Sequence, residues 1–325
     1  MSASKRDVVG IGNAIVDILV EVDEHFLEKQ ELAKGTMALI DAGQALELYR
    51  KLNDYVEQSG GSAANTMAGI ASLGGSSGFI GRVRDDELGA AFTRDIRQVG
   101  VEYTTPPALA GPSTGRCIVL VTPDGERTMQ TYLGACAALS MEDLNEEMIA
   151  TSAVTYLEGY LWDPPEAKAA FLTAAAMAHE AGKKVSLSLS DPFCVERHRE
   201  EFQSLVDDHV DILFGNESEI LSLYETENLG AALDRVGSSC ELTAVTLGAD
   251  GAAVITGKAD RRVPALPVKN VVDTTGAGDL FAAGFLYGIT HGATPVDAAR
   301  TGGICAAMVI SQFGARPKER LADLI

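Results

Sequence analysis

The residues best suited to chemistry stand near the end of the chain, in Asp273-Thr274-Thr275-Gly276-Ala277-Gly278-Asp279. A helical pattern follows this segment, so two glycines open a helix. The unpaired backbone N–H groups of such a turn, together with the helix dipole, form an anion hole. The loop lacks the Gly-Lys-Ser/Thr ending of a Walker A motif. The pattern therefore indicates a phosphate cradle of another type.

Asp279 falls in the first turn of that helix, where the dipole favours the ionised carboxylate. A carboxylate beside a phosphate cradle is suited to accept the proton of a hydroxyl that attacks a γ-phosphate. The alternative is an ordinary helix start with an acidic first turn, and one such motif alone does not decide between the two interpretations.

Two further motifs suit the binding of hydroxyl groups. Gly60-Gly61-Ser62-Ala63-Ala64-Asn65 opens a helical pattern, its small residues clear space, and Asn65 offers a donor and acceptors. Asp17 interrupts an apolar run and needs partners if buried, which two adjacent sugar hydroxyls would supply. The alternatives are tight helix packing for the first motif and an exposed edge-strand carboxylate for Asp17.

Two motifs follow predicted strands on the nucleotide side. Asn216-Glu217-Ser218-Glu219 comes directly after Asp211–Phe214, at the strand end where α/β proteins bind ligands, and its oxygens suit a hydrated Mg²⁺. An acidic helix cap is the alternative. Thr246-Leu247-Gly248-Ala249-Asp250-Gly251 is a strand end and tight turn that is weak evidence of a nucleotide site by itself.

The elements that must position these residues alternate between strands and helices. Apolar runs predict strands at residues 8–11, 154–157, 185–189, 212–214 and 242–247, with helical stretches between them, and two helices at 276–291 and 295–311. This alternation predicts a parallel sheet covered on both faces. Residues 116–121 and 128–133 flank the turn Thr122-Pro123-Asp124-Gly125 and predict a hairpin. The hairpin and the apolar runs within 15–40 do not fit the alternation, so we assign them to a small β appendage over a cleft.

Composition narrows the function. The 325 residues carry a formal net charge of −20, which disfavours nucleic acid and membrane surfaces as partners. The five cysteines are scattered and indicate reduced thiols rather than disulfides or a zinc site. Without a signal-peptide pattern or a long apolar run, a cytoplasmic protein is expected.

Taken together, the motifs near residues 60 and 273, with Asn216-x-x-Glu219 and Thr246-x-Gly248-x-x-Gly251, resemble the PfkB/ribokinase family of carbohydrate kinases from Gly10 to about Pro317. The resemblance implies one kinase domain over 1–325 with a ribokinase-like three-layer fold and a discontinuous β-lid from about 14–41 and 112–134. It implies Asp279 as the base and Gly276, Ala277 and Gly278 as the anion hole, with Arg127 on the lid contacting the transferring phosphoryl group. A solvated turn residue is the alternative for Arg127.

The resemblance also assigns binding roles. The substrate residues implied are Asn13, Asp17, Met37, Leu39, Gly61, Ser62, Asn65, Leu161 and Phe193, of which the apolar ones are equally explained as core. The ATP residues implied are Asn216, Thr246, Gly248, Gly251 and Thr275, with Asn216 and Glu219 organising Mg²⁺ through water. A monovalent cation such as K⁺ near Asp273 and Gly314 is left open.

Within the family, the stretches 157–161, 187–193 and 211–219 are most similar to the members that phosphorylate adenosine. The expected reaction is transfer from MgATP to the 5′-hydroxyl of adenosine, giving AMP and ADP. A sugar kinase acting on ribose or fructose, a kinase of another nucleoside, and a catalytically dead nucleotide sensor are the alternatives. The expected partners are small molecules only, and the chain is expected to be a monomer or a homodimer.

Overall fold

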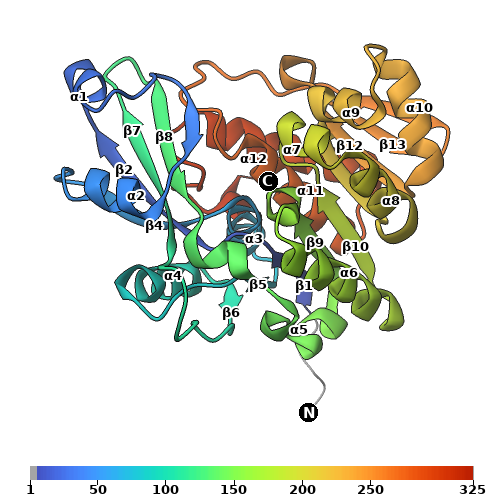
Figure 1. Cartoon of the computed structure of the whole chain (residues 1–325). Helices are drawn as coiled ribbons and strands as arrows, with labels where there is room; N and C mark the ends of the chain where they lie inside the picture. The colour runs from blue at the N-terminus through green and yellow to red at the C-terminus, as the bar shows by residue number, and fades with distance from the viewer. Residues whose placement is uncertain (1–5, 325) are drawn as a thin grey trace.

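The computed structural model describes residues 6–324, and two β-sheets dominate it (Figure 1). The larger sheet has the strand order β14-β13-β12-β11-β10-β9-β1-β5-β6. Its strands are β1 (Arg6–Ile11), β5 (Ser77–Ile80), β6 (Glu102–Tyr103), β9 (Ser152–Glu158), β10 (Lys184–Ser188), β11 (Ile212–Asn216), β12 (Leu242–Thr246), β13 (Ala252–Thr256) and β14 (Ala259–Val263). Every pairing is parallel except β12–β13 and β13–β14. The predicted mostly parallel central sheet is confirmed.

Helices cover both faces of this sheet, because successive side chains along each buried strand point to opposite faces and both faces are apolar. In β1, Val8 packs in the core with α3, α11 and α12, whereas Val9 packs in the core with α5, α6 and α8 to α10. The helices of these layers are α3 (Ser62–Ser72), α4 (Glu87–Gln98), α5 (Glu146–Thr151), α6 (Pro165–Glu180), α7 (Pro192–Arg197), α8 (Arg199–His209), α9 (Glu217–Tyr224), α10 (Leu229–Ser239), α11 (Ala277–Thr290) and α12 (Pro295–Ile310). The two C-terminal helices fall within a residue of their predicted bounds.

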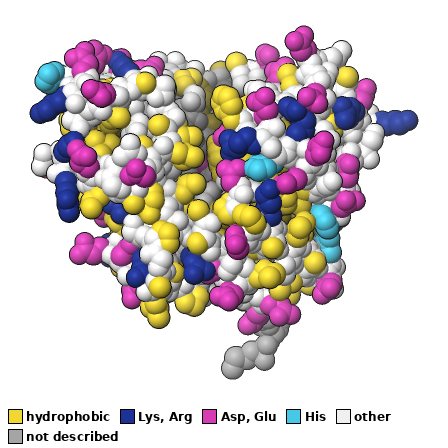
Figure 2. All heavy atoms as spheres, in the orientation of Figure 1, with side chains coloured by type: hydrophobic (Ala, Val, Ile, Leu, Met, Phe, Trp, Pro, Cys, Tyr) yellow, Lys and Arg dark blue, Asp and Glu magenta, His cyan; other side chains and the backbone are white. Residues whose placement is uncertain are grey.

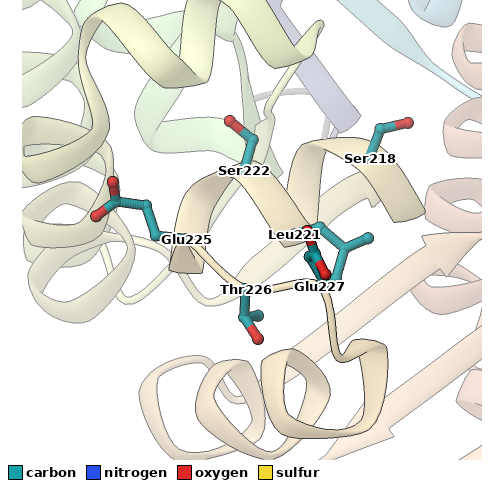
Figure 3. A pocket seen from close by; sticks show the side chains of 6 residues that line it. All are labelled: Ser218, Leu221, Ser222, Glu225, Thr226 and Glu227. Atoms are coloured by element: carbon teal, nitrogen blue, oxygen red, sulfur yellow. The ribbon is translucent and has the colours of Figure 1, made fainter.

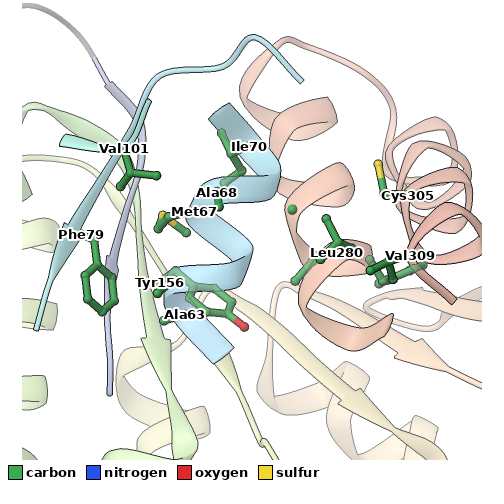
Figure 4. Close-up of a cluster of buried hydrophobic side chains, with 14 of the residues drawn as sticks. Ala63, Met67, Ala68, Ile70, Phe79, Val101, Tyr156, Leu280, Cys305 and Val309 are labelled. Carbon is green, nitrogen blue, oxygen red and sulfur yellow. The ribbon is translucent and has the colours of Figure 1, made fainter. Parts of the chain in front are cut away.

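Close packing of α3 against α11 brings two helix starts together. Figure 4 shows α3 between the strands that carry Phe79 and Tyr156 and the helix that carries Leu280. A Cβ atom on Gly69 would lie 2.6 Å from the Cβ of Ala283, so the two helices approach as closely as glycine allows. The N-terminal turns of α3 and α11 therefore lie side by side.

The smaller sheet has the order β3-β8-β7-β2-β4 and joins segments far apart in the sequence. Its strands are β2 (Ile15–Glu21), β3 (Met37–Leu39), β4 (Val56–Gly60), β7 (Gly115–Val121) and β8 (Arg127–Tyr132). Strands β7 and β8 form the predicted hairpin, with antiparallel register from Arg116 opposite Tyr132 to Val121 opposite Arg127. Strand β4 also belongs to this sheet, although the sequence pattern did not assign it there.

The two faces of the smaller sheet have different neighbours. Val16, Ile18 and Leu120 pack in the main core with residues of α1 (Glu24–Lys29) and α2 (Ala42–Tyr49). The alternate side chains of the same strands, including Leu19 and Val119, point away from those helices and line a cleft. The smaller sheet is thus a lid with a helix-covered outer face and an open apolar inner face (Figure 1).

The five cysteines are all free and buried. Between residues 6 and 324, no helix has the length and apolar character needed to cross a membrane.

Candidate active site

A cleft of about 1020 Å³ lies between the lid sheet and the carboxyl ends of the central strands, the usual ligand position in α/β folds. Figure 2 shows the hollow between these two parts of the molecule, with hydrophobic side chains on both sides of it. The predicted site residues that line the cleft are Asn13, Asp17, Met37, Leu39, Gly61, Ser62, Asn65, Arg127, Phe193, Asn216, Glu219, Thr246, Gly248, Thr275, Gly276, Ala277, Gly278 and Asp279.

Two predicted site residues do not line the cleft. Leu161 is buried in the core on the other side of the sheet, packed among the side chains of α6 and α7. Gly251 terminates a turn in which a Cβ would meet the carbonyl oxygen of Val263 at 2.0 Å, so its glycine serves the chain's own turn. Direct contact with a ligand is therefore not supported for either residue.

A second hollow of about 440 Å³ lies on the outer side of α9 (Figure 3). It is lined by Ser218, Leu221, Ser222, Glu225, Thr226 and Glu227. Glu225 is already paired with Arg199 at 2.8 Å, and Ser218 is the one residue of the site motifs that lines this hollow. This hollow lacks the chemistry that the larger cleft gathers.

Asp279 lies in the first turn of α11, and α3 supplies two donors to it. Ser62 Oγ donates to Asp279 Oδ1 at 2.6 Å, and Asn65 Nδ2 donates to Asp279 Oδ2 at 3.0 Å. Burial raises the pKa of Asp279 to about 6, although both hydrogen bonds and the nearby Arg316 act in the opposite direction. The carboxyl group is thus ionised at neutral pH and has a pKa near that of an efficient general base.

Asp17 faces the cleft from β2 without a hydrogen-bond donor among residues 6–324. Burial raises the pKa of its carboxyl group to about 7; Arg316 and Arg127 lower it, and Asp279 raises it further. A Cβ on Gly60 would lie 2.4 Å from the Asp17 carboxylate. The first glycine of the Gly-Gly pair therefore makes room for the protein's own carboxylate rather than for a ligand.

Asn13 presents a second acceptor next to Asp17. Its Nδ2 donates to Glu158 Oε1 at 2.7 Å, which leaves Oδ1 buried without a hydrogen-bond partner at the cleft wall. Gly61, with φ +103°, begins α3 where a Cβ would collide with the Asn13 carbonyl oxygen at 2.0 Å. Glu158 also accepts from the backbone N–H of Ala63 at 2.8 Å and so ties Asn13 to the start of α3.

Arg127 reaches from the lid to the glycine-rich loop. Its Nη1 donates to Thr275 Oγ1 at 2.9 Å, it forms an ion pair with Asp273, and its guanidinium carbon lies 4.5 Å from the ring centre of Phe313. Asp273 also accepts the backbone N–H groups of Thr275 at 3.0 Å and Gly314 at 2.8 Å. The lid arginine and the glycine-rich loop are therefore in direct contact.

Asn216 and Glu219 cap the start of α9 reciprocally. Glu219 accepts from Asn216 N at 2.9 Å and from Asn216 Nδ2 at 2.6 Å, while Asn216 Oδ1 accepts from Glu219 N at 2.9 Å. The predicted alternative, an acidic helix cap, is thus present, but both residues also line the cleft. Burial raises the pKa of Glu219 to about 7, as expected for a carboxyl group without a neighbouring cation.

These residues fit a Mg²⁺ ion that brings most of its own ligands. In the described part of the chain, no group of three or more His, Cys, Asp or Glu side chains could hold a metal. Mg²⁺ typically keeps several waters and binds through one or two carboxylates and substrate phosphates. The donor set is therefore suited to a nucleotide-borne ion held through water. The K⁺ site near Asp273, which the sequence left open, stays untested, and the Asp273 carboxylate is engaged by Arg127.

The apolar part of the cleft is formed by both sides. From the lid, Leu19, Met37, Leu39, Val119, Met129 and Leu133 contribute, and Phe193 and Tyr160 lie across from them. Met37 is 50% exposed, Leu39 63% and Phe193 72%. Large hydrophobic side chains exposed around one cleft are typical of a surface that a ligand covers.

Two buried charged residues were not predicted from the sequence. Glu158 ends strand β9 and fixes Asn13, and Arg316 follows α12 and donates to Asn65 Oδ1 at 2.9 Å. An acidic residue at the end of an apolar run was a usable signal for Glu158. Arg316 stands in a polar segment that carries no periodic pattern, and its contact spans 251 residues.

Comparison with known proteins gives consistent matches over the whole chain. Residues 35–320 match the model of the pfkB family of carbohydrate kinases. The adenosine kinase from Sinorhizobium meliloti is 50% identical, with a TM-score of 0.91 over 99% of this chain and 98% of that one. A probable sugar kinase protein from Rhizobium etli is 48% identical, with the same TM-score and the same coverage. Adenosine kinase 1 of Arabidopsis thaliana is 26% identical over 98% of this chain and 99% of its own.

Proposed function

The chain belongs to the pfkB family of carbohydrate kinases, and from this premise we propose that it transfers the γ-phosphoryl group of MgATP to the 5′-hydroxyl of adenosine. The choice of substrate rests on one observation, which is that a polar surface and an apolar surface lie in the same cleft. Unpaired acceptors for hydroxyl groups stand beside an exposed apolar wall of a size suited to a base. The 50% identical relative is an adenosine kinase, which supports the same choice.

The polar half of the cleft is suited to a ligand whose hydroxyl groups donate hydrogen bonds. Asp17 and Asn13 Oδ1 are acceptors at the cleft wall, and Asn13 Oδ1 is buried without a hydrogen-bond partner among the described residues. A buried acceptor without a donor costs free energy, so a ligand with adjacent hydroxyls is favoured at this wall. The 2′- and 3′-hydroxyls of a ribose supply such a pair.

The apolar half of the cleft separates a nucleoside from a bare sugar. A planar base between Phe193 and the lid residues Met37 and Leu39 would remove their exposed surface from water. A free sugar has no comparable apolar face, and it would leave these side chains exposed. The 48% identical probable sugar kinase keeps the sugar-kinase alternative in view, but no feature of the cleft favours it.

Asp279 is the proposed general base. Its carboxylate takes the proton of the 5′-hydroxyl while the hydroxyl oxygen bonds to the γ-phosphorus. The bond from this phosphorus to the β,γ-bridging oxygen breaks, and ADP leaves. The donors Ser62 and Asn65 hold the carboxylate in place. Charge on the transferring group is stabilised by the backbone N–H groups that open α11 and by Arg127.

Asn216 and Glu219 would hold the waters of a Mg²⁺ ion, which neutralises phosphate charge when bound with ATP. Thr246 and Gly248 line the same end of the cleft and would border the nucleotide. Arg127 connects the two ends of the cleft, because it extends from the lid and donates a hydrogen bond to Thr275 of the glycine-rich loop.

A substrate panel tests this proposal. We expect kcat/KM for adenosine to exceed that for ribose or fructose by at least about 100-fold, because burying a base contributes on the order of 3 kcal/mol. The kcat/KM for inosine tests whether the protein distinguishes the hydrogen-bonding edge of the nucleoside's base. Equal kcat/KM for ribose and adenosine would replace the nucleoside assignment with a sugar-kinase one.

A pair of variants tests where the adenine base of the substrate binds. Phe193→Ala should lower kcat/KM for adenosine and leave that for ribose unchanged, because only adenosine uses the apolar wall. Leu172→Ala is the matched control, since Leu172 is 40% exposed on α6 outside the cleft. A similar loss for both substrates in Phe193→Ala would place the base elsewhere.

A further inference from the structure

Arg316 is a buried cation behind the cleft wall, on the segment that follows α12. It is only 8% exposed and does not line the cleft. Its Nε donates to Asn65 Oδ1 at 2.9 Å, whereas both terminal nitrogens, Nη1 and Nη2, are buried without a hydrogen-bond partner in the described chain. Burying a guanidinium with two unpaired nitrogens is costly, so the position calls for an explanation.

The hydrogen bond from Arg316 determines how Asn65 is oriented. An arginine has only donors, so the atom it contacts on Asn65 must be the amide oxygen. The other end of the same amide, Nδ2, then donates to Asp279 Oδ2 at 3.0 Å. Rotating the amide by 180° would set donor against donor at Arg316 and acceptor against carboxylate at Asp279. Arg316 therefore allows only the orientation that supports Asp279.

The charge of Arg316 acts on the same carboxylates. The groups that face Asp279 are Ser62 and Asn65 on α3, Asp17 on β2, Glu158 and Tyr156 on β9, Tyr160 just after β9, and Arg316. Arg316 is the one cation in this set, and it lowers the pKa of both Asp279 and Asp17 against the effect of burial. Burial and the negative charge of Asp279 both raise the Asp17 pKa, so a buried counter-charge favours the ionised forms of these two carboxyl groups.

Asp95 attracts the Arg316 charge more strongly than Asp17 or Asp279 does, but a purely structural ion pair with Asp95 leaves the hydrogen bond to Asn65 unexplained. Arg316 Nη1 lies 3.9 Å from Asp95 Oδ2, beyond hydrogen-bond distance. The same Asp95 oxygen already accepts from Ser59 N at 2.8 Å and from Ser59 Oγ at 2.5 Å. Asp95 is thus satisfied from β4, and the firm hydrogen bond of Arg316 goes to Asn65.

We propose that Arg316 is a positioning residue for the general base, Asp279. It orients the Asn65 amide toward Asp279 and supplies the buried positive charge that Asp279 and Asp17 share. The inference deepens the proposed function and rests on it for the role of Asp279 in proton transfer. It acts through Asn65 and through the field of its charge, and it involves no contact with a substrate.

The test compares Arg316→Gln and Arg316→Lys with the wild-type protein, with Arg82→Gln as the matched control. Arg82 is a partly buried arginine paired with Asp143 at 2.9 Å, away from the cleft. The readouts are the Asp279 titration, followed by ¹³C NMR of labelled aspartate carboxyls and assigned with Asp279→Asn, and the pH profile of kcat with adenosine and MgATP.

We expect Arg316→Gln to raise the Asp279 pKa by about one unit or more, and to move the acidic limb of the kcat profile upward by a similar amount. Arg316→Lys keeps the charge, so it should keep the titration near that of the wild type while lowering kcat through the lost Asn65 contact. If Arg316→Gln does not fold, the lysine variant still tests the split between pKa and kcat. Arg82→Gln should match the wild type in both readouts.

An unchanged Asp279 titration in folded Arg316→Gln, or wild-type kcat in Arg316→Lys, would overturn the inference. A wild-type protein that phosphorylates no nucleoside would overturn the proposed function instead, while the NMR titration would still decide the inference. The two failures are therefore distinguishable.

Discussion

Gly276 and Gly278 stand two residues apart in the same loop, yet one added methyl group should affect them in different ways. Gly276 has φ +78°, and a Cβ there would lie 2.8 Å from the Cα and carbonyl oxygen of Ala315. Gly278 is the second residue of α11, where a Cβ would meet nothing within 4 Å because it would point into open space. Alanine substitutions at these two glycines should therefore distinguish an effect on folding from an effect on catalysis.

The magnitudes follow from these surroundings. Gly276→Ala combines a left-handed conformation with a backbone collision, so we expect a loss of about 2–4 kcal/mol in the free energy of unfolding. Gly278→Ala gains roughly 0.5–1 kcal/mol from helix propensity. Its methyl group, however, would stand where a phosphate oxygen must approach the backbone. Loss of one such donor contact typically lowers kcat by about 10²–10³.

The assay measures the melting temperature of each variant and the rate of ADP release with adenosine. Gly276→Ala should lower both the melting temperature and the rate, whereas Gly278→Ala should lose activity with an equal or higher melting temperature. Gly230→Ala is the control, because Gly230 holds the same second position in α10 away from the cleft. Activity of Gly278→Ala within threefold of the wild type would show that the loop does not cradle the phosphate.

Four further outcomes are expected. Asp279→Asn cannot take the proton, so kcat should fall by about 10²–10⁴ while calorimetry shows little change in adenosine affinity; near wild-type turnover would remove Asp279 from the mechanism. Because burial raises the Asp279 pKa to about 6 and the base must be ionised, wild-type kcat should fall as the pH drops below about 6, and a flat profile down to pH 5 would contradict this. The unpaired acceptors of Asp17 predict that 2′-deoxyadenosine loses roughly ten- to a hundredfold in kcat/KM, and that Asp17→Ala harms adenosine far more than the deoxynucleoside; equal losses would mean that Asp17 does not read the 2′-hydroxyl. Closure of the lid predicts slower hydrogen exchange across residues 116–133 when adenosine is added, and unchanged exchange at saturation would argue against closure.

Local patterns were sufficient for much of the fold and for the position of the glycine-rich loop. Two glycines before an apolar helical period mark the start of α11, and Thr122-Pro123-Asp124-Gly125 marks the turn between β7 and β8. Both signals lie within a few residues of the element that they specify. Strand β4, with its polar sequence Val-Glu-Gln-Ser-Gly, carries no such signal and joins the lid only through pairing with β2.

The contacts that complete the site depend on the tertiary fold. Arg316 reaches Asn65, and Glu158 reaches Asn13, through separations of 251 and 145 residues. No local pattern shows which distant side chain a buried charge will meet. The same limit explains Leu161, whose apolar side chain suits a base pocket and a core equally well until the packing of α6 and α7 is known.

Short crossings connect the lid to the rest of the fold at residues 12–14, between β1 and β2, and at residue 61, between β4 and α3, whereas longer segments enter β7 from β6 and lead from β8 to β9. The strands between these crossings and the β7–β8 hairpin carry most of the apolar wall, whereas α11, β11 and β12 carry the proposed phosphate end. Exchange of the apolar side chains of the lid, with Asp17 and Arg127 kept, is therefore a modular route to new acceptor specificity. A library confined to Leu19, Met37, Leu39, Val119 and Met129 would sample base recognition while leaving the phosphoryl-transfer apparatus of the parent enzyme intact.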